Sequence, residues 1–252
     1  MTLPKLEALQ TWAANACGAS VDGGGTTYVA AADYYWSSTA DGGSASLLSA
    51  FQTLLAAVVA STTVTLNDAT GKVTITWGSG SHTLAWASTT VRDRFGFADD
   101  LASSTGETGT KQVEGLWLPN MPASFVRGSW ASAGMRRTDR RIVRNSAGVI
   151  YKRRHNSVVD NTLRFGALTA AKCWVAEEDT ANESAEQFWL DALDVGAPFR
   201  YHRDRATDGT YVTYHDLLEE FAPVRRKGNV DASWDWEIPV GQYVHAATGG
   251  GI

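Results

Sequence analysis

Short runs of alternating apolar and polar residues, separated by glycine-rich turns, recur along this chain of 252 residues. The clearest runs follow a stretch at residues 45–60, whose apolar side chains fall on one helical stripe. The period then changes to two at residues 64–66, 73–77 and 82–86, with turns at NDATGK and GSGS. We therefore expect a helix packed on a three-stranded antiparallel meander.

The C-terminal part predicts one helix followed by short strands. Thr180 and Glu183 form a T-x-x-E capping box, and Gly196 is placed to end the helix in the left-handed conformation. The apolar face of this helix is expected to consist of Ala185, Phe188, Trp189, Ala192 and Leu193. Strands are expected near residues 163–167, 197–202, 211–216, 219–225 and 232–240.

Three weaker signals lie between these parts. Thr90 with Asp93 indicates a short capped helix. Residues 102–112 contain no apolar residue larger than alanine and are expected to form a surface loop. Residues 115–122, GLWLPNMP, predict a strand that its prolines confine to a sheet edge or a domain crossing.

The expected fold class is therefore α+β, mainly β, with four parts. Residues 1–122 form a helix-on-meander domain, and residues 123–160 form a basic arm or linker. Residues 161–246 form a β-sandwich-like domain with one helix, and residues 247–252 form a flexible tail. Tryptophan is frequent, with 10 residues, and the tryptophans fall mainly on the apolar phases of these elements, as core or interface anchors do.

Charge is strongly segregated along the chain. The net charge is −5, but the segment from Arg127 to Arg164 carries ten basic residues and two acidic ones, which gives +8 there and −13 elsewhere. The SAG turn at Gly148 indicates a hairpin whose strands are too charged on both faces to be buried in a monomer. We expect the arm to contact acidic surfaces of neighbouring subunits through Arg136, Arg137, Arg140, Arg141, Arg144, Lys152, Arg153 and Arg154.

The sequence contains no convincing catalytic or metal-binding pattern. His202 and His215 fall on separate strands and are better explained as the polar face of a half-exposed hairpin than as metal ligands. The acidic run at residues 177–179 is explained by the helix start that follows it. Nucleophile-elbow and phosphate-loop motifs are missing from the sequence. We therefore expect a protein that is not an enzyme and uses neither cofactor nor metal.

The sequence also gives no sign of secretion or of a membrane span. Its first 20 residues have no secretory pattern, and no window approaches ~18 consecutive apolar residues. Cys17 and Cys173 are expected to be free thiols, because two distant cysteines form neither a disulfide framework nor a metal motif.

The module of residues 187–240 resembles distal-tail and other minor tail structural proteins of long-tailed bacteriophages. It consists of a helix with Phe188-Trp189, a GAPFRY strand, a YVTY strand and the aromatic-rich strand WDWEI. The N-terminal part also looks like phage structural proteins, in its Tyr-Tyr strand, its LLSAFQTLL helix, its GKVTITW hairpin and its RDRFGFADDL segment. Residues 127–158 have no counterpart in this resemblance.

The resemblance implies a virion structural protein, a ring-forming component of the tail tip or baseplate. Its partners would be copies of itself in a ring and other tail proteins, without a membrane, and it would be assembled in the host cytoplasm and located in the virion tail. Rings arise from head-to-tail interfaces that close. The aromatic side chains expected to anchor subunit contacts are Phe188, Trp189, Phe199, Tyr201, Trp234 and Trp236.

Two alternatives remain open on sequence grounds. One is a head-to-tail connector or tail terminator whose basic arm contacts DNA, which is possible but not favoured because the rest of the chain is acidic. The other is a carbohydrate-binding tail module, which requires exposed tryptophans.

Overall fold

The computed structural model confirms a mainly β protein with a few helices, 42% strand and 18% helical. Its largest sheet curls into a half-barrel. Within the described part of the chain, no helix is long and apolar enough to cross a membrane. The structure describes residues 5–36, 45–118, 135–144, 150–175, 183–202, 211–216, 220–225 and 233–242.

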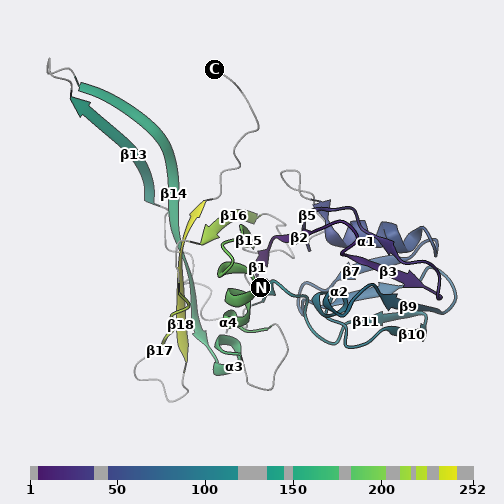
Figure 1. Cartoon of the computed structure of the whole chain (residues 1–252). Helices are drawn as coiled ribbons and strands as arrows, with labels where there is room; N and C mark the ends of the chain where they lie inside the picture. Colours follow the sequence, from purple (N-terminus) through teal and green to yellow (C-terminus); the bar gives the residue numbers. More distant parts are fainter. Residues whose placement is uncertain are drawn as a thin grey trace.

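An eight-stranded antiparallel sheet, the large sheet, organises one half of the molecule (Figure 1). Three short helical segments accompany it, namely α3 (Ala170–Cys173), α4 (Ala185–Phe188) and the π-helical η1 (Trp189–Leu193). In spatial order its strands are β12 (Leu116–Trp117), β1 (Lys5–Ala8), β15 (Phe199–His202), β16 (Tyr211–Asp216), β18 (Trp234–Gln242), β14 (Ile150–Leu168) and β13 (Met135–Arg144), with β17 (Val224–Arg225) also pairing with β18.

This sheet differs from the sandwich-like C-terminal domain predicted from sequence. All described strands after residue 134 belong to one sheet rather than to two packed sheets. It also recruits β1 and β12 from the part of the chain assigned to the N-terminal domain. β12 lies at the edge of the sheet, as predicted for residues 115–122, whose two prolines lie outside the described residues.

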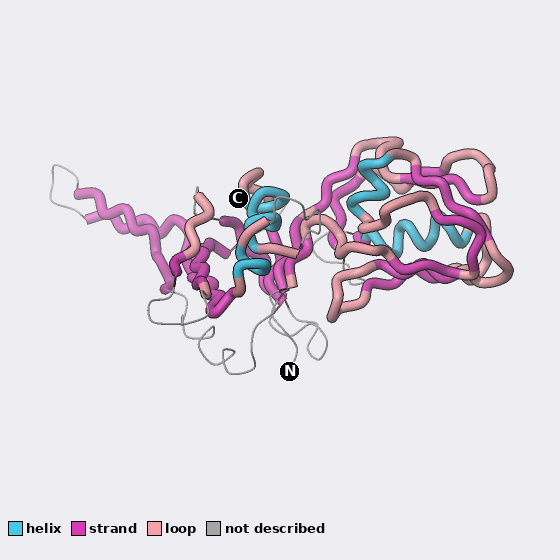
Figure 2. Tube along the Cα trace, turned by 90° about the horizontal axis from the view of Figure 1, so that it is seen from below, coloured by secondary structure: helices cyan, strands magenta, loops and turns pink. Residues whose placement is uncertain are grey.

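Residues 9–36 and 45–115, which lie between β1 and β12 in the chain, form the N-terminal lobe, the second half of the molecule (Figures 1 and 2). Its helices are α1 (Leu47–Ala56) and α2 (Thr89–Arg94). Three small sheets surround them: β10 (Leu101–Ser104), β9 (His82–Trp86), β3 (Gly18–Val21) and β4 (Thr27–Tyr28); β11 (Gly106–Thr108), β8 (Val73–Thr76) and β7 (Thr63–Leu66); β2 (Gln10–Trp12), β5 (Ala32–Tyr35) and β6 (Ala45–Ser46).

The predicted helix is confirmed as α1, but the predicted meander is wrong. β7 pairs with β8, whereas β9 leaves this pair and joins β3 and β10 in another sheet. The chain turns away from β8 near Gly78. Glycine is required there because a Cβ atom at this position would collide with the carbonyl oxygen of Ala60. The partner strand of β9 lies about 65 residues earlier in the chain, and alternation of apolar and polar residues does not reveal such a non-local pairing.

The surface loop predicted at residues 102–112 is also wrong in part, because it contains the strands β10 and β11. Both lie at sheet edges and are largely exposed, so backbone hydrogen bonds rather than apolar side chains define them. Edge strands of this kind lack the alternation on which sequence prediction depends.

Two helix starts also lie away from the predicted caps. Ser88 caps α2 by accepting a hydrogen bond from the Val91 N–H, in place of the predicted Thr90–Asp93 pair. Ser184 caps α4 by accepting from the Gln187 N–H, and Thr180 lies outside the described residues. Gly196 has the predicted left-handed conformation, with φ of +68°.

Candidate interaction surfaces

A two-stranded hairpin extends away from the body of the molecule (Figures 1 and 2). Strand β14 pairs with β18 only from Asp160 onwards, whereas residues 150–160 pair with β13. We call residues 135–144 and 150–160 the arm hairpin. At ~3.3 Å per residue it reaches about 30 Å beyond the sheet. The predicted hairpin is thus confirmed, and its turn at Gly148 lies outside the described residues.

The register of the arm hairpin places like charges opposite one another. Arg140 stands opposite Arg154, and Arg141 opposite Arg153. Directly opposed like charges destabilise an antiparallel pair, and an isolated two-stranded hairpin is marginally stable in water. All eight basic residues predicted to contact neighbours lie in β13 or β14. An acidic partner would therefore stabilise this hairpin.

The predicted aromatic anchors lie mostly inside the chain's own core. Phe188, Trp189, Phe199 and Trp236 are buried in the cluster between the large sheet and its helices, and only Tyr201 and Trp234 remain partly exposed. A subunit contact requires accessible side chains, which four of the six anchors lack in this structure. The apolar face predicted for the C-terminal helix is confirmed, since all five of its residues are buried.

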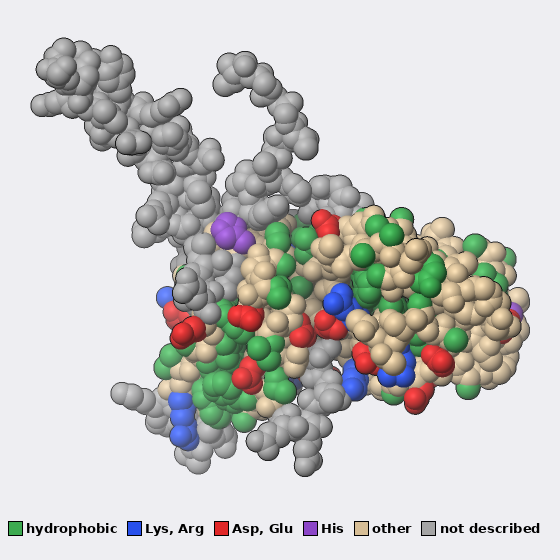
Figure 3. Space-filling model, in the orientation of Figure 1, with side chains coloured by type: hydrophobic (Ala, Val, Ile, Leu, Met, Phe, Trp, Pro, Cys, Tyr) green, Lys and Arg blue, Asp and Glu red, His purple; other side chains and the backbone are tan. Residues whose placement is uncertain are grey.

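One exposed apolar surface lies over α3 and α4, where Figure 3 shows hydrophobic side chains gathered. Leu190 is 52% exposed and Trp174 is 36% exposed. The Trp174 ring stands edge-on to Phe221 at 5.5 Å and to Trp234 at 6.3 Å between centroids. We call these four residues the apolar patch; Trp174 and Leu190 are exposed, whereas Phe221 and Trp234 are partly buried against the core. The apolar spacing of the tryptophans in the sequence does not reveal that Trp174 is exposed.

A hydrogen bond from backbone to side chain joins the residue after Trp174 to helix α4. The Glu186 carboxylate accepts a hydrogen bond of 2.8 Å from the N–H of Val175, next to Trp174. Leu190 follows Glu186 by about one helical turn. The helix here changes from α to π, since the N–H of Asp194 donates to the carbonyl of Trp189. Such π segments are frequent at functional sites.

Acidic side chains accompany the apolar patch. The described segment 183–196 carries four acidic residues and no basic one, and Glu220 precedes Phe221. Figure 3 shows both acidic and basic side chains at the border of the hydrophobic area, with the acidic ones more frequent. The four acids of this segment are Glu183, Glu186, Asp191 and Asp194.

A buried ionic cluster fastens the N-terminal lobe to the large sheet. In β1 and β15, Lys5 stands opposite His202 and Glu7 opposite Arg200, and all four are at most 1% exposed. The Glu7 carboxylate lies 2.8 Å from Nε2 of His202. The Arg200 guanidinium stacks on the ring of Tyr35, which belongs to the N-terminal lobe, at 3.5 Å. Buried charges require such partners.

This buried ionic cluster corrects the prediction made for His202. His202 is buried and not on a half-exposed hairpin face. His202 pairs in register with Tyr211, and His215 with Gly241, so the two histidines do not face each other. Complementary charges at alternate positions, K-x-E at residue 5 and R-x-H at residue 200, are the signal that could have identified the cluster.

A second set of charges lies where η1 approaches the N-terminal lobe. Burial raises the pKa of Asp191 to about 6; the Gln187 hydrogen bond and Arg94 oppose this rise, and Glu114 adds to it. Burial also raises the pKa of Glu114, against the attraction of Arg94. The guanidinium of Arg94 lies 3.5 Å from the Glu114 carboxylate and over the ring of Trp12.

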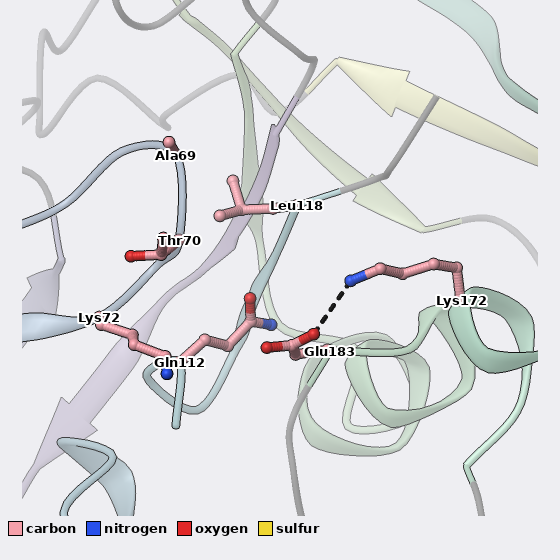
Figure 4. A pocket seen from close by; sticks show the side chains of 7 residues that line it. All are labelled: Ala69, Thr70, Lys72, Gln112, Leu118, Lys172 and Glu183. Atoms are coloured by element: carbon pink, nitrogen blue, oxygen red, sulfur yellow. Dashed lines mark hydrogen bonds and ion pairs between the residues drawn. The ribbon is translucent and has the colours of Figure 1, made fainter. Parts of the chain in front are cut away.

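A pocket of about 350 Å³ lies between the lobe and the helices (Figure 4). Nζ of Lys172 forms an ion pair of 3.0 Å with Glu183 inside it, and Lys72 adds a second positive charge to the lining. The lining residues are Ala69, Thr70, Lys72, Gln112, Leu118, Lys172 and Glu183.

The described residues include no group of three or more His, Cys, Asp or Glu that could hold a metal ion. Cys17 and Cys173 are free, and burial raises the pKa of each thiol to about 12, so both stay protonated near neutral pH.

No protein-family model, curated protein or solved structure matches this chain.

Proposed function

We propose that the protein is a virion structural protein of a tailed bacteriophage, a ring-forming component of the tail tip or baseplate. The observation that carries the proposal is the arm hairpin, which spreads eight basic residues over about 30 Å beyond the sheet of an otherwise acidic chain. The sequence resemblance of residues 187–240 to phage tail proteins supports it.

The mechanism is assembly. A projecting basic hairpin on one subunit and acidic surface on the next create a head-to-tail interface, and such interfaces close into rings when the rotation between subunits permits it. The large sheet and its aromatic core form the platform that holds the arm hairpin. Electrostatic complementarity sets the specificity of the contact and accelerates association.

The proposal is tested by reversing charges on the arm hairpin. The arm-reversed variant carries Arg140→Glu, Arg141→Glu, Arg153→Glu and Arg154→Glu, and a control carries Arg92→Glu and Arg164→Glu on the body of the molecule. Sedimentation should show assemblies for the wild type and the control, and a folded monomer for the arm-reversed variant. Circular dichroism and thermal unfolding verify that the variant is folded.

Normal assembly of the arm-reversed variant would refute the proposal. A wild-type chain that stays monomeric, yet binds duplex DNA with an affinity that falls steeply with salt, would favour the connector or terminator alternative instead.

A further inference from the structure

We propose that the apolar patch of one subunit is the docking site for the arm hairpin of a neighbouring copy. This inference rests on the proposed function and names the surface that receives the arm. The patch consists of Trp174, Leu190, Phe221 and Trp234, with Glu186 of α4 and Asp194 after η1 beside it.

Charge complementarity identifies the occupant. The arm hairpin, residues 135–144 and 150–160, carries eight Lys and Arg and two Asp, a net charge of +6. Of the four acids of the described segment 183–196, Glu183 is paired with Lys172, and Asp191 is buried near Arg94 and Glu114 of the N-terminal lobe. The charges left beside the patch are Glu186, Asp194 and Glu220 against Arg225, which stands opposite Trp234 in register. Opposed arginines in the hairpin register need counter-charges, and this acidic surface supplies them.

The two surfaces also match in their apolar content. The outermost described rungs of the arm hairpin pair Arg144 with Ile150, Val143 with Tyr151 and Ile142 with Lys152. Each of these cross-strand pairs therefore contains at least one apolar residue, and two of the three also contain a basic residue. The patch offers the complementary combination of exposed Trp174 and Leu190 among carboxylates. Aromatic side chains in such a contact are typical binding anchors.

The geometry excludes a contact within one chain. Figure 1 places the outer end of the arm hairpin and helix α3 at opposite ends of the large sheet. The arm can therefore reach a patch only on another copy. Because donor and acceptor surfaces differ, the contact is head-to-tail and leaves a free arm and a free patch at the ends of each open assembly.

Photo-cross-linking tests the contact in the full chain. A benzophenone amino acid is introduced at Leu190, and ¹⁵N-labelled chains are mixed with unlabelled ones so that mass spectrometry identifies links between copies. Matched control chains carry the same probe at Val58 of the N-terminal lobe, which is 54% exposed against 52% for Leu190. We expect links from position 190 to peptides of residues 135–160, and none to these peptides from position 58.

A second measurement uses the arm-reversed variant as the unlabelled partner. The yield of links from position 190 should fall at least about tenfold, which corresponds to ~1.4 kcal/mol of lost affinity. Links from position 190 to other segments only, or no link between copies, would overturn the docking proposal. If assembly still depends on arm charge in that case, the proposed function stands and only the assigned surface is wrong.

Discussion

Replacement of Asp191 by Asn should stabilise the protein in a pH-dependent way. Burial between η1 and the N-terminal lobe raises the pKa of this carboxyl from 3.8 to about 6, and the nearby carboxylate of Glu114 adds to the effect. Oδ1 accepts a hydrogen bond from Gln187, whereas Oδ2 is buried without a hydrogen-bond partner among the described atoms. The amide keeps the Oδ1 acceptor and removes the buried charge.

The linkage between proton binding and folding gives the sign of the pH dependence of stability. The folded state binds the Asp191 proton more tightly than the unfolded state, so the wild type loses stability as the pH rises from about 4 to about 6. A shift of two pKa units corresponds to ~3 kcal/mol at most. Because Asp191 is partly exposed and solvent screens it, we expect a gain of roughly 1–2 kcal/mol for Asp191→Asn above pH 6.5.

Urea unfolding at pH 4 and pH 7.5 measures this gain. The free energy of unfolding of Asp191→Asn should exceed that of the wild type at pH 7.5 and nearly equal it at pH 4. The control is Asp194→Asn, an exposed residue on the same helix, which should change stability by less than about 0.5 kcal/mol. A destabilised Asp191→Asn at pH 7.5, or an equal gain at both pH values, would refute the reasoning.

Three further changes probe the fold. Glu7→Ala removes the buried partner of His202 and should cost about 3–5 kcal/mol in urea unfolding, where a cost below 1 kcal/mol would be contradictory. Gly78→Ala introduces the colliding Cβ and should lower the thermal midpoint, whereas Gly25→Ala, with open space around it, should leave the midpoint nearly unchanged. Phe51→Ala removes a fully buried ring of the N-terminal lobe and should cost about 3–5 kcal/mol in the same unfolding assay.

Local patterns were predicted well from the sequence. The apolar stripe of α1 and the apolar face at residues 185–193 can be predicted because the repeat that defines each of them lies within one short segment of sequence. The arm hairpin was predicted because its two strands are separated by one short turn.

Non-local pairing was not predicted. β9 joins β3, and β1 joins β15 almost 200 residues away, and nothing in either strand specifies its partner. Glu7 and Arg200 are brought together only by the pairing of β1 with β15. The buried ionic cluster therefore could not be predicted without that pairing.

Apolar periodicity also cannot distinguish an interior from an interface. Trp236 and Phe199 lie at apolar positions of their strands, which suit a core and a subunit interface equally well. In the structure both are buried in the core of the chain. The exposure of Trp174 and Leu190 depends on how α3 and η1 pack on the sheet, which the sequence does not encode locally.

Negative-stain electron microscopy of the purified chain over a range of concentrations tests the central claim most directly, because it shows whether copies assemble head to tail. The account predicts closed rings for the wild type and for the Arg92→Glu, Arg164→Glu control, and single particles for the arm-reversed variant. Single particles at every concentration for all three proteins, or rings for all three, would contradict it.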